Sequence, residues 1–270
     1  MSKRLALAVA LGATWAAWAA TPAHAQTEDD QGDLIAMGGD YTPESWPVER
    51  VLQPPMLARG LRQVELALGA SVGAEPGQPV TLAPGFSSGL SDKLTLLVRH
   101  RGGLCLGEAA VCPVRYGGLR GLLRFGLVAV PYKFHVALQG GLSLDDVDPV
   151  IGGAELGLAA KLMFGRVGLE LEPVLAIALN QRDVRTRELL VFPVELQIGL
   201  AQRLTLTVLA TLSGGISNFD DTGRLGVGAG GWWSPARRLD LGAELRFDAA
   251  AGAAASADLR TLTLAARRRW

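Results

Sequence analysis

Apolar and polar residues alternate along most of this chain, beginning at about residue 61. Residues 133–139, 203–212 and 238–248 each place an apolar residue at every second position. Side chains of a β-strand point alternately to its two faces, so a period of two predicts strands with one apolar and one polar face. In the second of these runs the apolar row is Leu204, Leu206, Val208, Ala210 and Leu212.

The alternating runs are joined in two ways. Several runs begin with a basic residue, as at Lys93, Arg203 and Arg238, only a few residues after the preceding run ends. The other connections are longer and polar: 102–115, 145–149, 180–187, 218–223 and 249–257. We predict twelve strands linked as hairpins, at residues 61–72, 79–90, 93–101, 115–129, 133–143, 150–163, 166–179, 188–200, 203–216, 223–233, 238–248 and 257–270.

Alternation alone does not say which face is buried, because a soluble sandwich or small barrel turns its apolar face inward. The runs are about 9–14 residues long, whereas ordinary strands average about 5–6 and a tilted membrane strand needs about 9–11. A closed barrel of about twelve strands is also wider than the roughly eight strands whose interior side chains can fill. The polar faces carry charges of both signs, which are costly against lipid. We therefore predict an all-β fold: a transmembrane antiparallel up-and-down β-barrel of about twelve strands, apolar face outward.

Composition narrows the possible functions. Hydrophobic residues make up 49% of the 270 residues, yet no run after the N-terminus reaches the roughly 18 consecutive apolar residues of a membrane helix. Lysine plus arginine and aspartate plus glutamate are equal at 26 each. Because there is no basic excess, we expect no nucleic-acid partner.

The first 25 residues have the form of a secretory signal peptide. Lys3 and Arg4 precede an uncharged apolar stretch over residues 5–20, and Ala23 and Ala25 form a small-residue cleavage site. The alternative is an uncleaved membrane anchor, but the apolar stretch is short and the cleavage site is clear. We predict cleavage after Ala25 and exclude residues 1–25 from the fold.

The last strand carries a terminal pattern. The chain ends in Trp270, and stepping back by two positions gives Arg268, Ala266, Leu264 and Leu262. This arrangement resembles the bacterial outer-membrane β-barrel proteins, although Arg268 departs from it. The resemblance implies a porin-like or transporter-like protein of the outer membrane, with lipid and the barrel-assembly machinery as partners. It also implies that Leu262, Leu264 and Trp270 form the C-terminal assembly signal.

Residues 26–60 differ from the barrel region, residues 61–270. They are rich in acidic residues and proline and lack any period. We predict an irregular periplasmic N-terminal arm, and the sequence leaves open whether it folds into a plug or extends freely.

Charged residues on the polar faces are the main functional indication. Either they pair and close the interior, or they line a pore and set its ion preference. We predict a channel or transporter for small solutes that is not an enzyme and has no cofactor, with a non-conducting structural or surface-presenting barrel as the alternative. The predicted lumen-lining residues are Arg120, Arg124, Lys133, His135, Glu155, Lys161, Arg166, Glu170, Glu172, Glu195, Arg203, Asp240, Glu244 and Arg246.

A third hypothesis is a lipid-acting outer-membrane enzyme that uses a serine–histidine pair. His100 lies at a strand end where it would face lipid, and Ser87 and Ser88 precede it in the sequence. No spacing identifies a third group to orient the histidine, so two structural histidines are the favoured interpretation.

The remaining motifs indicate structure. Cys105 and Cys112 are predicted to form a disulfide in an oxidising compartment, because too few ligands lie nearby for zinc. The acidic turn at 145–148 lacks the ligand set of a calcium loop, so no metal site is expected. Glycines at 226, 228 and 230 have no following helix that would indicate a phosphate loop. They are expected to leave space for a bulky neighbour or for the N-terminal arm.

Overall fold

The computed structural model describes residues 41–72, 79–100, 102–107, 112, 116–147, 150–180, 187–252 and 260–270. The predicted signal peptide and residues 26–40 of the predicted arm lie outside the described residues. One sheet contains all the strand segments. They are β1 (Arg62–Ser71), β2 (Val80–Ser91), β3 (Leu94–His100), β4 (Leu104–Leu106), β5 (Leu119–Val130), β6 (Phe134–Val147), β7 (Val150–Phe164), β8 (Val167–Leu171), β9 (Val174–Ala178), β10 (Glu188–Ala201), β11 (Leu204–Gly215), β12 (Arg224–Ala236), β13 (Leu239–Gly252) and β14 (Arg260–Arg269).

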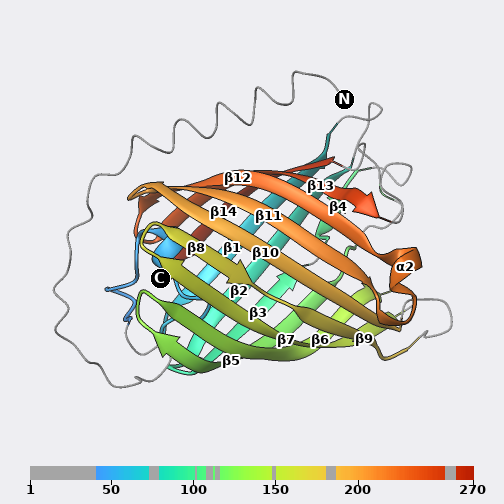
Figure 1. Cartoon of the computed structure of the whole chain (residues 1–270), viewed down its shortest axis with the longest axis horizontal. Coiled ribbons are helices and arrows are strands. Elements are labelled where there is room, and N and C mark those ends of the chain that lie inside the picture. The colour runs from blue at the N-terminus through green and yellow to red at the C-terminus, as the bar shows by residue number, and fades with distance from the viewer. Residues whose placement is uncertain are drawn as a thin grey trace. The chain divides into compact units, whose positions relative to one another are not determined.

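The sheet closes on itself because β1 pairs with both β2 and β14 (Figure 1). Two wall strands are interrupted: β3 and β4 both pair with β2, and β8 and β9 both lie between β7 and β10. With each interrupted pair counted as one strand of the wall, the barrel has the twelve antiparallel strands that the alternation predicts. The predicted fold class is confirmed.

The break between β8 and β9 was not visible in the pattern, which predicted one strand over 166–179. Pro173 has no amide hydrogen to donate to the ladder. Its carbonyl accepts a bond from the Leu158 amide at 3.0 Å, and the Glu172 amide donates to the carbonyl of Pro193 at 3.2 Å. Two prolines on adjacent wall strands therefore interrupt the pairing at one level of the barrel.

Differences from the predicted boundaries gather at the long-loop end. Strands β6 and β13 continue to Val147 and Gly252, into segments predicted as loops. Residues 216–222 form short helical turns, η2 (Ile216–Asn218) and α2 (Phe219–Thr222). The short turns at the opposite end follow the prediction closely, because each is only two or three residues long.

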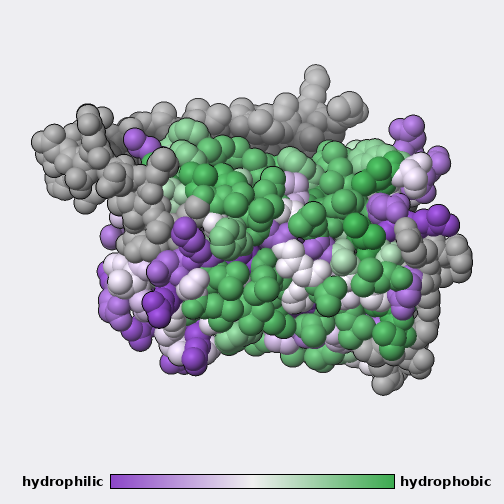
Figure 2. Space-filling model, turned by 90° about the horizontal axis from the view of Figure 1, so that it is seen from below, coloured by the Kyte–Doolittle hydropathy of each residue, from purple (hydrophilic) through white to green (hydrophobic). Residues whose placement is uncertain are grey.

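The apolar rows face outward. In β11, Leu206 and Val208 are 38% and 43% exposed, whereas Thr205 and Thr207 are 4% and 0% exposed. Figure 2 shows a broad apolar surface along one side of the barrel, with hydrophilic side chains toward both ends and in a narrow seam. A soluble barrel would reverse this pattern, so the exterior is suited to lipid.

The described part of the predicted arm packs within the barrel at its short-turn end. We call residues 41–61 the plug; it contains one 3-10 turn, η1 (Arg50–Leu52), and is otherwise irregular. The Leu57 amide donates to the Thr95 hydroxyl on β3 at 3.1 Å. Its apolar side chains form the largest buried hydrophobic cluster of the described residues: Tyr41, Trp46, Leu57, Ala58 and Leu61.

Candidate functional site: the plugged, charged lumen

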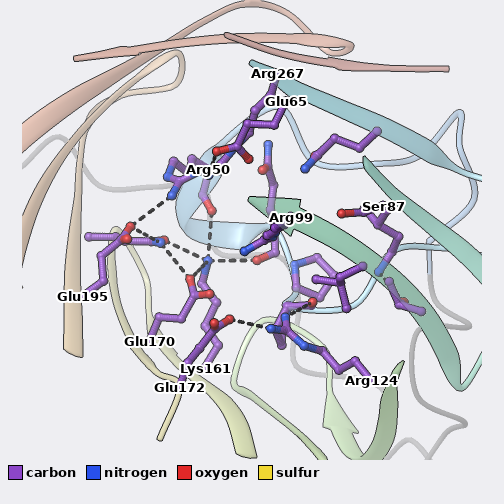
Figure 3. Close-up of a pocket in the computed structure, with 18 of the residues that line it drawn as sticks. Arg50, Glu65, Ser87, Arg99, Arg124, Lys161, Glu170, Glu172, Glu195 and Arg267 are labelled. Carbon is purple, nitrogen blue, oxygen red and sulfur yellow. Dashed lines mark hydrogen bonds and ion pairs between the residues drawn. The ribbon is translucent and has the colours of Figure 1, made fainter. Parts of the chain in front are cut away.

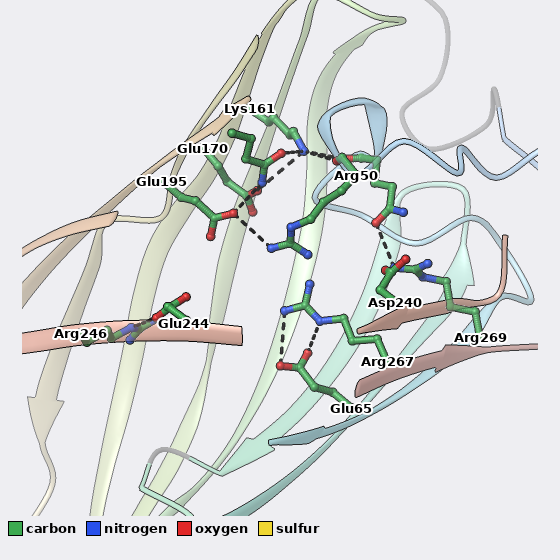
Figure 4. Close-up of polar contacts among 12 residues, drawn as sticks. Arg50, Glu65, Lys161, Glu170, Glu195, Asp240, Glu244, Arg246, Arg267 and Arg269 are labelled. Carbon is green, nitrogen blue, oxygen red and sulfur yellow. Dashed lines mark hydrogen bonds and ion pairs between the residues drawn. The ribbon is translucent and has the colours of Figure 1, made fainter. Parts of the chain in front are cut away.

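Lys161 of β7 holds two main-chain oxygens of the plug. Its Nζ donates to the carbonyl oxygens of Arg50 at 3.0 Å and Gln53 at 2.8 Å (Figure 4). It also donates to Oε1 of Gln197 at 2.8 Å, and a carboxylate oxygen of Glu170 lies 3.8 Å away. The Lys161 side chain is only 2% exposed. Its charge is therefore compensated by protein oxygens in place of water.

Arg50 anchors the plug in the opposite sense, by donating to the wall. Its Nη2 lies 3.1 Å from Oε1 of Glu195 on β10, and its guanidinium lies 4.3 Å from the ring centre of Trp232. The Gln197 amide donates to Glu195 at 2.8 Å and to Glu170 at 3.0 Å. One glutamine thus links the two carboxylates that neutralise Arg50 and Lys161.

Arg124 of β5 makes a third attachment. Its Nη1 donates to the carbonyl oxygen of Pro55 in the plug at 2.6 Å. Its Nη2 donates to Gln139 at 2.9 Å and to Glu172 at 2.7 Å. Arg124 and Lys161 have a similar arrangement: each pairs with a carboxylate of the wall, donates to a wall glutamine and donates to carbonyl oxygens of the plug.

Arg269 of β14 makes the fourth. Its guanidinium pairs with Asp240, donates to Gln63 at 2.8 Å and donates to Oε1 of Gln53 in the plug at 2.9 Å. The Ser234 hydroxyl donates to the other oxygen of Asp240 at 2.8 Å. Both members of the ion pair are nearly fully buried, so their hydrogen bonds must replace the lost hydration.

Two cavities lie along the lumen, one of about 330 Å³ beside the plug and one of about 390 Å³ toward the long loops. They share Glu65, Arg99 and Arg246 in their linings, so these side chains mark the junction between them. Figure 3 shows Arg99 between the plug residue Arg50 and the wall residue Arg124. The remaining charged residues of the first cavity are Arg50, Arg124, Lys161, Glu170, Glu172, Glu195, Arg267 and Arg269.

Ten of the fourteen predicted lumen residues lie on inward-facing strand positions, and an eleventh, Glu172, lines the lumen from the break between β8 and β9. Five of them are buried: Arg124, His135, Glu155, Lys161 and Asp240. The other six are less buried: Glu172 lines the cavity beside the plug, and five point inward by strand register, namely Arg120, Glu170, Glu195, Glu244 and Arg246.

The prediction that the other three residues line the lumen is wrong. Lys133, Arg166 and Arg203 occupy the tight turns that precede β6, β8 and β11, and all three are exposed at the rim. Arg203 donates to the carbonyl oxygen of Pro235 at 3.1 Å. The alternation was extended one residue too far, because a turn residue outside the ladder does not follow the pleat.

The sequence interpretation missed five charged lumen residues. Glu65, Arg99, Arg267 and Arg269 lie opposite apolar rows in β1, β3 and β14, so the period of two could have found them. Arg50 had no such signal, because the plug is aperiodic.

The glycine row of β12 makes room for the neighbouring strand β13. A Cβ atom added to Gly228 would lie 3.0 Å from Cγ of Arg246, and one added to Gly230 would lie 3.0 Å from Cβ of Glu244. Arg246 and Glu244 form an ion pair. The nearest atoms are nevertheless carbonyl oxygens of β13, of Leu245 at 2.9 Å and of Ala243 at 2.5 Å, so the glycines mainly permit a close approach of the β13 backbone.

The serine–histidine arrangement of a lipid-acting enzyme does not form. Ser87 lines the lumen and is 4% exposed, whereas His100 belongs to the outward row of β3. Ser88 faces outward but pairs with Leu96, four residues before His100, roughly 13 Å along the strand. His100 instead packs edge-on against Tyr116, with ring centres 5.5 Å apart.

Cys105 and Cys112 form the expected disulfide, with Cα atoms 5.8 Å apart. The three residues of the predicted assembly signal face outward: Leu262, Leu264 and Trp270 are 40%, 51% and 46% exposed. Within the described ranges, no group of three or more histidine, cysteine or acidic side chains is arranged to hold a metal ion. No helix among the described residues is long and apolar enough to cross a membrane.

No protein-family model and no curated protein sequence matches the chain, but solved structures do. An outer-membrane channel from Pseudomonas putida F1 aligns with a TM-score of 0.54 and 13% identity, covering 79% of this chain and 97% of that one. The KdgM porin aligns with a TM-score of 0.53 and 7% identity over 76% and 98% of the two chains. For the NanC porin the values are 0.52 and 6%, over 76% and 97%.

At these identities the likeness is one of fold. It agrees with the closed antiparallel wall, the outward apolar rows and the charged interior. The chain therefore has the fold of the bacterial outer-membrane porins and channels.

Proposed function

We propose that this protein is an outer-membrane channel for small solutes, and that the plug holds it closed at the periplasmic end. The observation that carries the proposal is the pair of lumen cavities lined by charged side chains inside a barrel with an apolar exterior. A polar interior and an apolar exterior are what a solute pathway through lipid requires. The KdgM porin, which shares the fold, was solved in complex with disordered oligogalacturonate.

The plug is attached in a way that permits release. Five basic side chains of the described residues hold it by hydrogen bonds and one ion pair: Lys161, Arg124, Arg237 and Arg269 of the wall, and its own Arg50. On this proposal, passage through the short-turn end requires the plug to shift, and a local opening that breaks these contacts would allow it.

A non-conducting structural barrel is the second candidate. The observation that favours it is the same network, because the charges of the short-turn half are mostly paired and the plug fills that end. The two functions differ in one property, the mobility of the plug: a channel requires the plug to move away from the wall, whereas a structural barrel does not.

A reversible cross-link tests this difference. A Cβ atom at Gly199 would lie 3.6 Å from Cγ2 of Val51 in the plug, so cysteine side chains at these two positions would lie within reach of each other. The double variant Val51→Cys/Gly199→Cys should conduct in planar bilayers when reduced and lose conductance when oxidised. The single variant Val51→Cys should not respond to oxidation.

The other outcomes separate the candidates. Absence of conductance in the wild type and in the reduced double variant would support the structural barrel. Equal conductance in the reduced and oxidised states would keep the channel but reject the plug as its gate. A first control is heat-modifiability on a gel, since a closed barrel extracted in mild detergent should migrate differently before and after boiling.

A further inference from the structure

One level of the barrel interior carries an unusual row of charges. The strand registers place six inward residues side by side around the wall, each directly opposite the next. Three of the six are arginines and one is a glutamate. They lie, in order, on strands β14, β1, β2, β3, β5 and β6. The row is Arg267, Glu65, Gly85, Arg99, Arg120 and Ser143.

The carboxylates near this row are already engaged. Both oxygens of Glu65 accept bonds from Arg267, at 2.6 and 3.3 Å. Glu155 of β7 lies 3.3 Å from Nη1 of Arg120. Among the described residues, Arg99 makes no hydrogen bond and no ion pair within 4 Å, although it interacts at longer range with the charges of Glu65 and Glu172.

Arg99 also stands directly opposite Arg120 across the β3–β5 pair. Like charges in this position destabilise a sheet. Inside a partly dehydrated lumen their repulsion is screened less than it would be on a surface. A local violation of this kind is expected where a site is built for a ligand rather than for stability.

The space around Arg99 is open. Its neighbour on the adjacent strand β2 is Gly85, which has no side chain. A Cβ atom at this position would lie 3.6 Å from Cγ of Arg99. Arg99 lines both lumen cavities, and Arg120 and Arg246 line the larger one beside it. A solute moving between the two cavities must pass these guanidinium groups.

We propose that Arg99 and Arg120 form a binding site for a small carboxylate anion at the junction of the two cavities. The planar guanidinium of Arg99 offers two parallel donors that match the two oxygens of a carboxylate. The anion would also separate the two opposed arginines electrostatically. The inference rests on the proposed channel function and deepens it, because it assigns the channel a solute class.

Binding is measured first without conduction. Succinate is titrated calorimetrically into the full-length protein in detergent, with succinamide as the uncharged probe. We expect wild type to bind succinate and not succinamide. Arg99→Gln should bind at least about tenfold more weakly, the factor that corresponds to loss of about 1.4 kcal/mol. Arg166→Gln removes the same charge from an exposed turn and should bind like wild type.

Ion selectivity is measured next, as the reversal potential across a potassium succinate gradient. Arg99→Gln should lower the anion preference relative to wild type and Arg166→Gln. No succinate binding by wild type, or equal binding by wild type and Arg99→Gln, would overturn the site even if the protein conducts. Binding that depends on Arg99 in a protein that never conducts would uphold the site and reject the channel.

Discussion

Lys161 is the residue whose loss should release the plug. Lys161→Met keeps most of the length of the side chain but removes its charge and its hydrogen bonds to the Arg50 and Gln53 carbonyl oxygens. A hydrogen bond to a charged group contributes about 1.5–3 kcal/mol. The two bonds together therefore give a loss of about 3–6 kcal/mol in the free energy of plug docking.

Thiol labelling of the plug measures this loss. Val51 is 1% exposed, and the two native cysteines are bonded to each other, so Val51→Cys adds a single buried thiol. If the plug opens and recloses faster than it is labelled, the maleimide reaction rate follows the open population. A loss of about 3 kcal/mol raises that population by about two orders of magnitude.

The matched control is Lys133→Met, the same substitution at an exposed turn position. In the Val51→Cys background it should leave the labelling rate unchanged. Adding Glu170→Gln to Lys161→Met should recover part of the loss, since it removes the carboxylate left without its cation. If Lys161→Met labels no faster than Lys133→Met, hydrogen bonding by Lys161 does not hold the plug and the reasoning fails.

Two further substitutions test the plug seat and the lipid face. A Cβ atom at Gly89 would lie 2.0 Å from the carbonyl oxygen of Ala58, so Gly89→Ala should displace the plug and accelerate Val51→Cys labelling. Gly121→Ala, which meets nothing within 4 Å, should not do so, and equal labelling of the two would reject the packing argument. On the outward row of β11, Val208→Arg should lower the unfolding free energy in lipid vesicles by about 2–4 kcal/mol, and Leu204→Arg near the rim by about 0–1 kcal/mol. Urea titration measures both, and equal costs would mean that Val208 does not face the bilayer midplane.

The barrel was predictable because one physical rule governs its whole length. Each wall strand has lipid on one face and a polar lumen on the other. Apolar and polar residues therefore alternate along its sequence with a period of two. Thr207 and Val208 are adjacent, yet one is fully buried and the other 43% exposed. The same rule could have identified Glu65 and Arg267, whose ion pair spans adjacent strands.

Contacts that depend on the plug were not predictable in this way. Arg50 reaches Glu195 from a segment with no repeating pattern, 145 residues away in the chain. The plug is attached mainly through its backbone carbonyl oxygens, and every residue has such an oxygen. The sequence therefore contains no residue type that marks where Lys161 and Arg124 will bind the plug.

The choice of carbonyl acceptors also bears on whether the plug can leave. Lys161 and Arg124 are each paired with a carboxylate of the wall, Glu170 and Glu172, and neither carboxylate belongs to the plug. Opening would therefore break hydrogen bonds without stranding an unpaired buried cation, which is the most costly outcome. Among the ion pairs of the described residues, only that of Glu195 with Arg50 would be broken, and Glu195 accepts a hydrogen bond from the Gln197 amide at 2.8 Å. A lumen neutralised independently of its plug is what a reversible closure requires, whereas a permanent seal would gain more from direct ion pairs between plug and wall.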